Sequence, residues 1–292
     1  MKEGDQARTQ ADFSEAVLAR SKGVMVELWL VLGVYRESMT LIGGWAPYFI
    51  VEKFGRKEDD FRHIGSIDID VALDPEKIDS EAYESIAKLL SQRGYKPRAD
   101  KLGDPIPFSF ERDVLEDFPP IQIDFLGPEY GGSGKSHRFQ KVQEDFKVRK
   151  ARGADVVLTS RFTQSIETIL PNGASEIAEI YIADAVGSIT TKAMALGDRY
   201  KEKDAYDIFA VVAHGDESPR HVAQRFKPLL SNGVVQEAIE IIAERFRSES
   251  ASGPFWVADF LGLEGVGRER IQAEAFAEVS RFLEEIQILG SQ

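Results

Sequence analysis

Apolar residues recur along this chain with two different periods. Up to about residue 183, short alternating or continuous apolar runs predict strands, and the stretches between them predict helices. Beyond residue 183 the period is three to four, which predicts helices alone. The pattern therefore predicts an α/β fold of the α+β kind: a mixed sheet flanked by helices in a first domain, 1–183, followed by an all-helical domain, 184–292. The helices of the second domain are expected at 184–200, 203–214, 218–230, 234–246 and 268–289.

Glycines and polar runs mark the ends of the elements predicted in the first domain. We expect a helix over 12–38, a strand at 40–42 and, after a glycine pair, a helix that ends at Gly55. Lys22-Gly23 predicts a break in the first helix, and the polar residues 56–64 predict a loop. Later elements are a strand at 66–73, a helix from Asp79 to Arg93, and strands at 107–111, 121–126, 156–166 and 177–182.

The composition is that of a folded, enzyme-sized chain. Of 292 residues, 43% are apolar and 29% are charged, which is the balance of a globular protein rather than a disordered one. The absence of cysteine excludes disulfides, thiolate metal sites and a cysteine nucleophile. No apolar stretch is long enough to span a membrane or to form a signal core, so we expect a cytoplasmic protein without membrane contact.

The charge distribution limits where a polyanion could bind. A formal net charge of −13 repels phosphate groups on average, so nucleic acid would need a local basic patch. The segment 134–153 is the candidate, and it is either a solvated face or loop, or a contact for RNA. Its cations are Lys135, Arg138, Lys141, Lys147, Arg149, Lys150 and Arg152, against Glu144 and Asp145.

Two aspartates occupy alternate positions in the strand predicted at 66–73. A period of two places Ser66, Asp68 and Asp70 on one face and apolar residues on the other. Neighbouring carboxylates repel each other unless a cation neutralises them, and oxygen ligands without nearby His or Cys favour a hard ion. We therefore expect Mg²⁺, with Mn²⁺ as the alternative, at these two aspartates.

A third aspartate, Asp124, interrupts the apolar strand predicted at 121–126. If the two acidic strands are neighbours, the three carboxylates converge and can hold two metal ions ~3.5–4 Å apart, the spacing used for nucleotidyl displacement. The alternative is that all three carboxylates face solvent from an exposed sheet. Gly43 and Gly44 favour the first interpretation, because glycines between a strand and a helix let backbone N–H groups approach a triphosphate.

Glycine turn, paired acids and third acid occur in a specific order. The N-terminal half thereby resembles the polymerase-β-like nucleotidyltransferase superfamily, whose pattern hG[GS], Dh[DE]h and h[DE]h is matched by Ile42-Gly43-Gly44, Asp68-Ile69-Asp70-Val71 and Ile123-Asp124-Phe125. More narrowly, it is similar to the AbiEii-type toxin nucleotidyltransferases through the [ST]-x-D-[IVL]-D strand at 66–70 and the later basic and KD-x-x-D stretches. The resemblance implies that Gly43, Gly44 and Ser66 hold the triphosphate, that Asp68, Asp70 and Asp124 hold the metals, and that Asp124 also assists activation of the attacking hydroxyl.

The resemblance also assigns charged residues of the second domain. Lys192 would contact phosphate, and because Arg199 lies seven positions later on the same predicted helix face, both could stabilise the transferring phosphates. The alternative is that they are ordinary surface cations. Asp204 and Asp207, close to Lys203, are expected to form local ion pairs or to cap a helix.

These expectations describe a Mg²⁺-dependent enzyme that transfers a nucleotide from an NTP to an acceptor hydroxyl and releases pyrophosphate. The AbiEii resemblance favours an RNA acceptor in a toxin–antitoxin setting, with an antitoxin as protein partner. The acidic chain favours a small or protein acceptor, as in aminoglycoside nucleotidyltransferases, and a non-catalytic nucleotide-binding scaffold is the alternative outside enzymes. One departure from the family is Ile64, which stands where an arginine is common, so that Arg62 or His63 would have to substitute.

Overall fold

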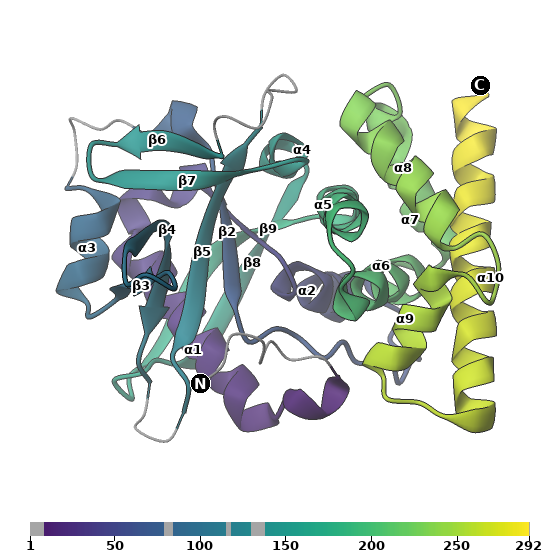
Figure 1. Cartoon of the computed structure of the whole chain (residues 1–292), viewed down its shortest axis with the longest axis horizontal. Helices are drawn as coiled ribbons and strands as arrows, with labels where there is room; N and C mark the ends of the chain where they lie inside the picture. The colour runs from purple at the N-terminus through teal and green to yellow at the C-terminus, as the bar shows by residue number, and fades with distance from the viewer. Residues whose placement is uncertain (1–8, 79–83, 115–117, 130–137, 292) are drawn as a thin grey trace. The chain divides into compact units, whose positions relative to one another are not determined.

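The computed structural model of the chain describes residues 9–78, 84–114, 118–129 and 138–291. Within them the fold is mixed α/β: a sheet of nine strands is flanked by helices, and from residue 184 on every regular element is a helix (Figure 1). This architecture confirms the fold class predicted from the apolar pattern. The predicted helix start at Asp79 and residues 134–137 of the basic segment, Lys135 among them, lie outside the described residues.

The chain forms two compact units that are not continuous in sequence. The sheet unit comprises residues 15–45 and 66–183, and the helical unit comprises residues 9–14, 46–65 and 184–291. The chain therefore leaves the sheet unit after Trp45, contributes 46–65 to the helical unit, returns, and leaves again after Ala183. A division into 1–183 and 184–292 shares the boundary at Asp184 but not this excursion.

The strands of the sheet unit follow the order β3-β4-β5-β2-β1-β9-β8, with β7 beside β5 and β6 beside β7. Strand β2 (Ile69–Leu73) pairs antiparallel with β1 (Met39–Ile42) and parallel with β5 (Ile121–Pro128). The two strands that carry the predicted aspartates are therefore direct neighbours. The other strands are β3 (Lys96–Ala99), β4 (Pro105–Arg112), β6 (Phe139–Gln143), β7 (Phe146–Ala151), β8 (Arg161–Ile169) and β9 (Ser175–Ala183).

The helices of the sheet unit are α1 (Glu15–Val31), α3 (Ile86–Gln92) and α4 (Ala154–Thr159). Helix α1 contacts β8 and β9, and it runs through Gly23 without the predicted break. A Cβ atom on Gly23 would lie 2.5 Å from the carbonyl oxygen of Ile169, at the end of β8. This glycine therefore permits close packing of α1 against the sheet and does not end the helix.

Three further sequence predictions need correction. The strand predicted at 66–73 begins only at Ile69. The strand predicted at 156–166 is split between α4 and β8, because a short buried apolar run does not distinguish helix from strand. The loop interpretation of the basic segment is wrong for residues 139–151, which form the antiparallel hairpin β6–β7.

The helical unit is organised around α6 (Glu202–His214), which is buried along most of its length and contacts α5 (Ala185–Asp198), α9 (Ser252–Phe260) and α10 (Gly265–Gly290). The remaining helices are α7 (Pro219–Phe226), α8 (Gly233–Arg245) and α2 (Trp45–Phe54), which begins directly after the glycine pair as predicted. Helix α9 was not predicted. None of the helices in the described ranges is both long and apolar enough to cross a membrane.

Candidate functional site

Two of the three predicted carboxylates are direct strand partners. In the parallel pair of β2 and β5, Asp70 lies opposite Asp124, so both side chains leave the same face of the sheet. Both residues are partly exposed. Asp68 is also partly exposed, but it lies in a bend before β2 begins at Ile69. The strand ladder therefore fixes the Asp70–Asp124 pair and does not extend to Asp68.

The glycine turn contacts the carboxylate of Asp70. Gly43 follows Ile42, the antiparallel partner of Asp70 in β1. Its φ of 66° lies in the left-handed region that favours glycine, and a Cβ atom there would lie 2.0 Å from Oδ2 of Asp70. Only glycine leaves room for the carboxylate at this position, so the turn and the acidic strand form one site.

Both carboxylate oxygens of Asp124 accept hydrogen bonds. Ser109 of β4, the antiparallel partner of Asp124, donates to Oδ1 at 2.5 Å, and Gln122 donates to Oδ2 at 3.0 Å. Arg98 of β3 donates in turn to Oγ of Ser109 at 3.2 Å. Sequence reasoning missed these three residues. Gln122 could have been found as the polar residue two positions before Asp124, whereas no local signal aligns β3 and β4 with β5.

The donor set fits a divalent ion held by two strand carboxylates. Asp70 and Asp124 offer oxygen ligands from adjacent strands, which is the chemistry that Mg²⁺ and Mn²⁺ prefer. Among the residues that the structure describes, no three His, Asp or Glu side chains form a group that could hold a metal ion. The register thus brings two of the predicted ligands together. Asp68 lies two residues before Asp70 but does not complete a group of three metal ligands.

The other residues predicted to bind the triphosphate lie before α2 and before β2. Gly44 is buried and directly precedes α2. Ser66 is buried and follows Gly65, whose φ of 85° also requires glycine. Their role toward phosphate stays a prediction.

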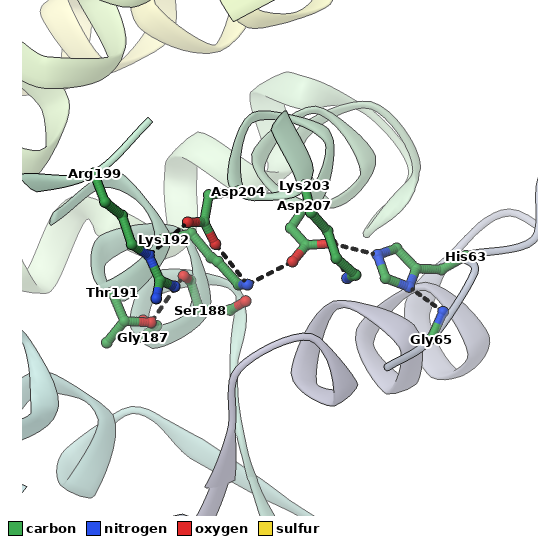
Figure 2. Close-up of polar contacts among 10 residues, drawn as sticks. All are labelled: His63, Gly65, Gly187, Ser188, Thr191, Lys192, Arg199, Lys203, Asp204 and Asp207. Carbon is green, nitrogen blue, oxygen red and sulfur yellow. Dashed lines mark hydrogen bonds and ion pairs between the residues drawn. The ribbon is translucent and has the colours of Figure 1, made fainter. Parts of the chain in front are cut away.

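The charged residues predicted in the helical unit form a buried network (Figure 2). Lys192 is 8% exposed, and its Nζ lies 3.0 Å from Oδ1 of Asp204 and 2.6 Å from Oδ2 of Asp207. Lys203 pairs with Asp207 at 2.8 Å, and Arg199 pairs with Asp204 at 3.2 Å. The ion pairs expected for the two aspartates are therefore present, and Lys192 is a buried partner rather than a surface cation.

His63 joins this network from the segment 56–65. The backbone N–H of Gly65 donates to Nδ1, which assigns the proton of the neutral ring to Nε2, and Nε2 donates to Oδ1 of Asp207 at 3.0 Å. Burial lowers the pKa of His63 to about 4, although Asp207 opposes the shift. His63 is therefore neutral near pH 7 and cannot replace the arginine charge that is missing at Ile64.

Burial and pairing act against each other on the remaining charges. Burial opposes the charge of Asp207, but Lys192 and Lys203 outweigh it and hold the Asp207 pKa well below its usual range. Burial also opposes the charge of Lys192, whose pKa the two carboxylates nevertheless raise. For Lys203 burial prevails and lowers the pKa. With His63 neutral, three cations face two carboxylates, so the network keeps one formal positive charge.

The predicted loop 56–64 is held firmly within the helical unit. His214, at the end of α6, lies 2.6 Å from the Asp59 carboxylate, and its ring stacks on Phe61 at 3.8 Å. Together with His63 these contacts attach the whole segment to α6.

The hairpin β6–β7 presents an aromatic ring among cations. In its register Phe139 lies opposite Arg149, and Lys141 lies opposite Lys147. Phe139 is 43% exposed and stacks on Phe108 of β4 at 5.4 Å, while the Arg149 guanidinium lies 5.5 Å from the Phe108 ring centre.

This hairpin is continuous with the carboxylate pair in the sheet. Arg149 is the β7 partner of Leu126, which lies two residues beyond Asp124 on β5. The hairpin is therefore paired with the strand that carries Asp124, but its aromatic stack lies on Phe108, which precedes Ser109 in β4 and so leaves the opposite face from Asp124.

No protein-family model and no curated protein matches the chain. The structure comparison matches the chain to the crystal structure of JHP933 from Helicobacter pylori, with a TM-score of 0.41 and 12% identity over 96% of this chain and 97% of that chain.

Proposed function

We propose that the chain is a Mg²⁺-dependent nucleotidyltransferase that transfers a nucleotide from an NTP to an acceptor hydroxyl. The observation that carries the proposal is the pairing of Asp70 with Asp124, with Gly43 against the Asp70 carboxylate. Glycine turn, acidic strand and second acidic strand meet in the order that the resemblance to polymerase-β-like nucleotidyltransferases implies. A plain turn next to a solvated sheet does not require this contact.

Each residue of the site has a task in the proposed reaction. Asp70 and Asp124, with Asp68 nearby, would hold Mg²⁺, which when bound stabilises charge on the reacting phosphate. Backbone N–H groups at Gly43 and Gly44 would bind the triphosphate at the start of α2. Asp124 would accept the proton of the acceptor hydroxyl while the hydroxyl oxygen bonds to the α-phosphorus. The bridge between α- and β-phosphates breaks, and pyrophosphate leaves.

The assignment of Lys192 and Arg199 to the phosphates, which the resemblance implies, stays a prediction. The buried network keeps one formal positive charge, and Arg199 is 47% exposed at its edge. An exposed cation of this kind attracts anions. Lys192 is bound by two carboxylates, so it would reach a phosphate only by exchanging one of them.

The test is transfer of label from α-phosphate-labelled NTPs, with Mg²⁺, to total RNA, to aminoglycosides and to the protein itself. We expect one acceptor class to be labelled, pyrophosphate to be released, and Asp68→Asn to lose transfer. Asp113→Asn is the matched control. This exposed carboxylate of the sheet unit pairs only with Lys96 among the contacts described, so the variant should transfer label at the wild-type rate. Nucleotide binding without pyrophosphate release over the whole panel would favour a non-catalytic scaffold.

RNA is the acceptor that the surface of the sheet unit favours. Single-stranded RNA is bound by aromatic rings that stack on bases and by cations that neutralise phosphates. Phe139 with Lys141, Lys147 and Arg149 offers both, on a hairpin that pairs with the strand carrying Asp124. A local basic patch of this kind allows RNA to bind although the net charge of −13 repels phosphate groups on average.

Substitution of Phe139 separates RNA from small acceptors. Loss of one stacking ring is worth ~1–3 kcal/mol, so Phe139→Ala is expected to raise the KM for RNA about tenfold and to leave the KM for NTP unchanged. Leu102→Ala is the control, because Leu102 is 87% exposed in the same unit. An unchanged KM for RNA excludes this surface, and labelling of aminoglycosides in place of RNA supports the small-molecule alternative.

A further inference from the structure

Neighbouring strands of the sheet unit align polar side chains in one row. Strands β3, β4, β5 and β2 lie side by side, and the register places Ser109 opposite Asp124 and Asp124 opposite Asp70. The pairing of β3 with β4 shifts its register at Arg98. Bulges of this kind redirect a side chain and are frequent beside active sites. The row therefore begins with a cation at a strand irregularity and ends at the acid pair.

The hydrogen bonds along this row have one possible direction. A guanidinium group carries donors only, so Nη1 of Arg98 donates to Oγ of Ser109. The hydroxyl proton of Ser109 is then directed to Oδ1 of Asp124. Arginine remains charged throughout the physiological pH range, so this direction does not change with pH.

Burial restrains the middle of the row. Ser109 is 1% exposed, so water cannot replace Asp124 as the acceptor of its proton without a substantial cost. A carboxylate has about four acceptor positions, and Ser109 and Gln122 occupy one on each oxygen. Each oxygen of Asp124 therefore keeps an acceptor position in a fixed orientation, which a metal ion or a proton can use.

We propose that Arg98 and Ser109 are positioning residues for Asp124. Arg98 fixes the direction of the Ser109 hydroxyl, and Ser109 holds the Asp124 carboxylate in one orientation beside Asp70. The inference rests on the proposed function, in which Asp124 binds the ion and accepts the proton of the acceptor. Partners that orient a metal ligand in this way typically contribute 10–100-fold to metal affinity or activity.

The test compares variants of the full chain by Mn²⁺ titration and by transfer kinetics. Ser109→Ala is expected to weaken Mn²⁺ binding and to lower kcat ~10–100-fold with the KM for acceptor unchanged. Ser109→Thr keeps the hydroxyl and should recover most of both. Lys96→Gln is the control. It removes a cation from β3, the strand of Arg98, but Lys96 pairs with Asp113 and not with Ser109. If Ser109→Ala does not fold, Ser109→Cys, of similar size but a weak donor, should show the same losses.

A double substitution tests the order of the row. Arg98→Gln alone should lower Mn²⁺ affinity and kcat about threefold to tenfold, but it should cost nothing further in the Ser109→Ala background, because it acts through the hydroxyl. Additive losses of Mn²⁺ affinity and kcat would show that Arg98 does not act through the Ser109 hydroxyl. Equal affinity and kcat in Ser109→Ala and wild type, with both lost in Asp124→Asn, would overturn the positioning role and leave the proposed function standing. Wild-type behaviour of Asp124→Asn would instead refute the proposed function.

Discussion

Two groups of charged residues in this protein differ in the sign of the neighbouring charges and in burial. In the sheet unit Asp70 and Asp124 are like charges, partly exposed and side by side, an arrangement that destabilises a sheet. In the helical unit Lys192, Asp204 and Asp207 are opposite charges that are buried and bond to one another. A buried network whose members are paired mainly maintains structure, whereas exposed like charges invite a cation. This contrast supports a ligand site in the first group and a structural role for the second.

The largest effect is expected from Asp70→Asn. A bound metal contributes several kcal/mol to transition-state stabilisation, so loss of this ligand should slow transfer on the order of 1000-fold. Its stability should stay equal or rise, because a like-charge repulsion is removed. Transfer rates and urea midpoints measure the two. A large loss of stability would place Asp70 with the structural group.

Asp207→Asn, in contrast to Asp70→Asn, should lower stability. It leaves Lys192 and Lys203 buried without their shared carboxylate, which is expected to lower the free energy of unfolding by ~3–5 kcal/mol. Glu217→Gln, in an exposed pair with His221, should change it by less than ~1 kcal/mol. Denaturant unfolding at pH 7.5 compares both with wild type. An unchanged midpoint for Asp207→Asn would contradict the structural role.

Acidification should act on the helical unit through His63. The unfolded histidine takes up its proton near pH 6.5 and the folded one only near 4, so the unfolded state binds more protons between these values. Its contribution is intact above pH 6.5 and is lost as the pH falls toward 4, which amounts to about 2 kcal/mol between pH 7.5 and pH 5. Urea curves at both pH values measure this loss.

The matched variants for this experiment are His63→Gln and His221→Gln. The first should lack this part of the pH dependence, whereas the second removes an exposed histidine and should keep it. Equal pH dependence in wild type and His63→Gln would show that His63 does not fold as a neutral ring.

An indirect disturbance of the same acid site is expected from Gly43→Ala. The left-handed φ costs an L-residue ~1–2 kcal/mol, and the new methyl group displaces the Asp70 carboxylate, so stability and transfer should both decrease. Gly33→Ala meets no atom within 4 Å and should be neutral or slightly stabilising. Normal transfer by Gly43→Ala would separate the glycine turn from the acid site.

The sequence identified the two acids but neither their pairing nor their surroundings. Period-two alternation in β2 and β5 identifies Asp70 and Asp124 as residues of one sheet face, because each strand is apolar on the other side. That β2 and β5 are neighbours depends on long-range pairing, which no local pattern encodes. Arg98 and Ser109 enter the site through the pairing of β3 with β4 and of β4 with β5, which is equally long-range, so neither was found.

Burial in the helical unit was hidden for a related reason. The helix periodicity identified the face of Lys192 but not its carboxylate partners, and the polar composition of 56–64 concealed that His63 is buried. In the basic hairpin the signal was present: apolar Phe146 and Val148 alternate with charged Lys147 and Arg149, which is the period of a half-buried strand. The abundance of charge masked it.

The excursion of 46–65 into the helical unit has a consequence for synthesis on the ribosome. His63 and Asp207 are 144 residues apart in the chain. At ~5–20 residues per second, the histidine emerges roughly 7–30 s before its carboxylate partner. Throughout that interval Phe61 also lacks the His214 ring on which it stacks. A nascent chain that has completed all strands of the described sheet thus still carries an undocked segment, which can close onto α6 only after α6 has been synthesised.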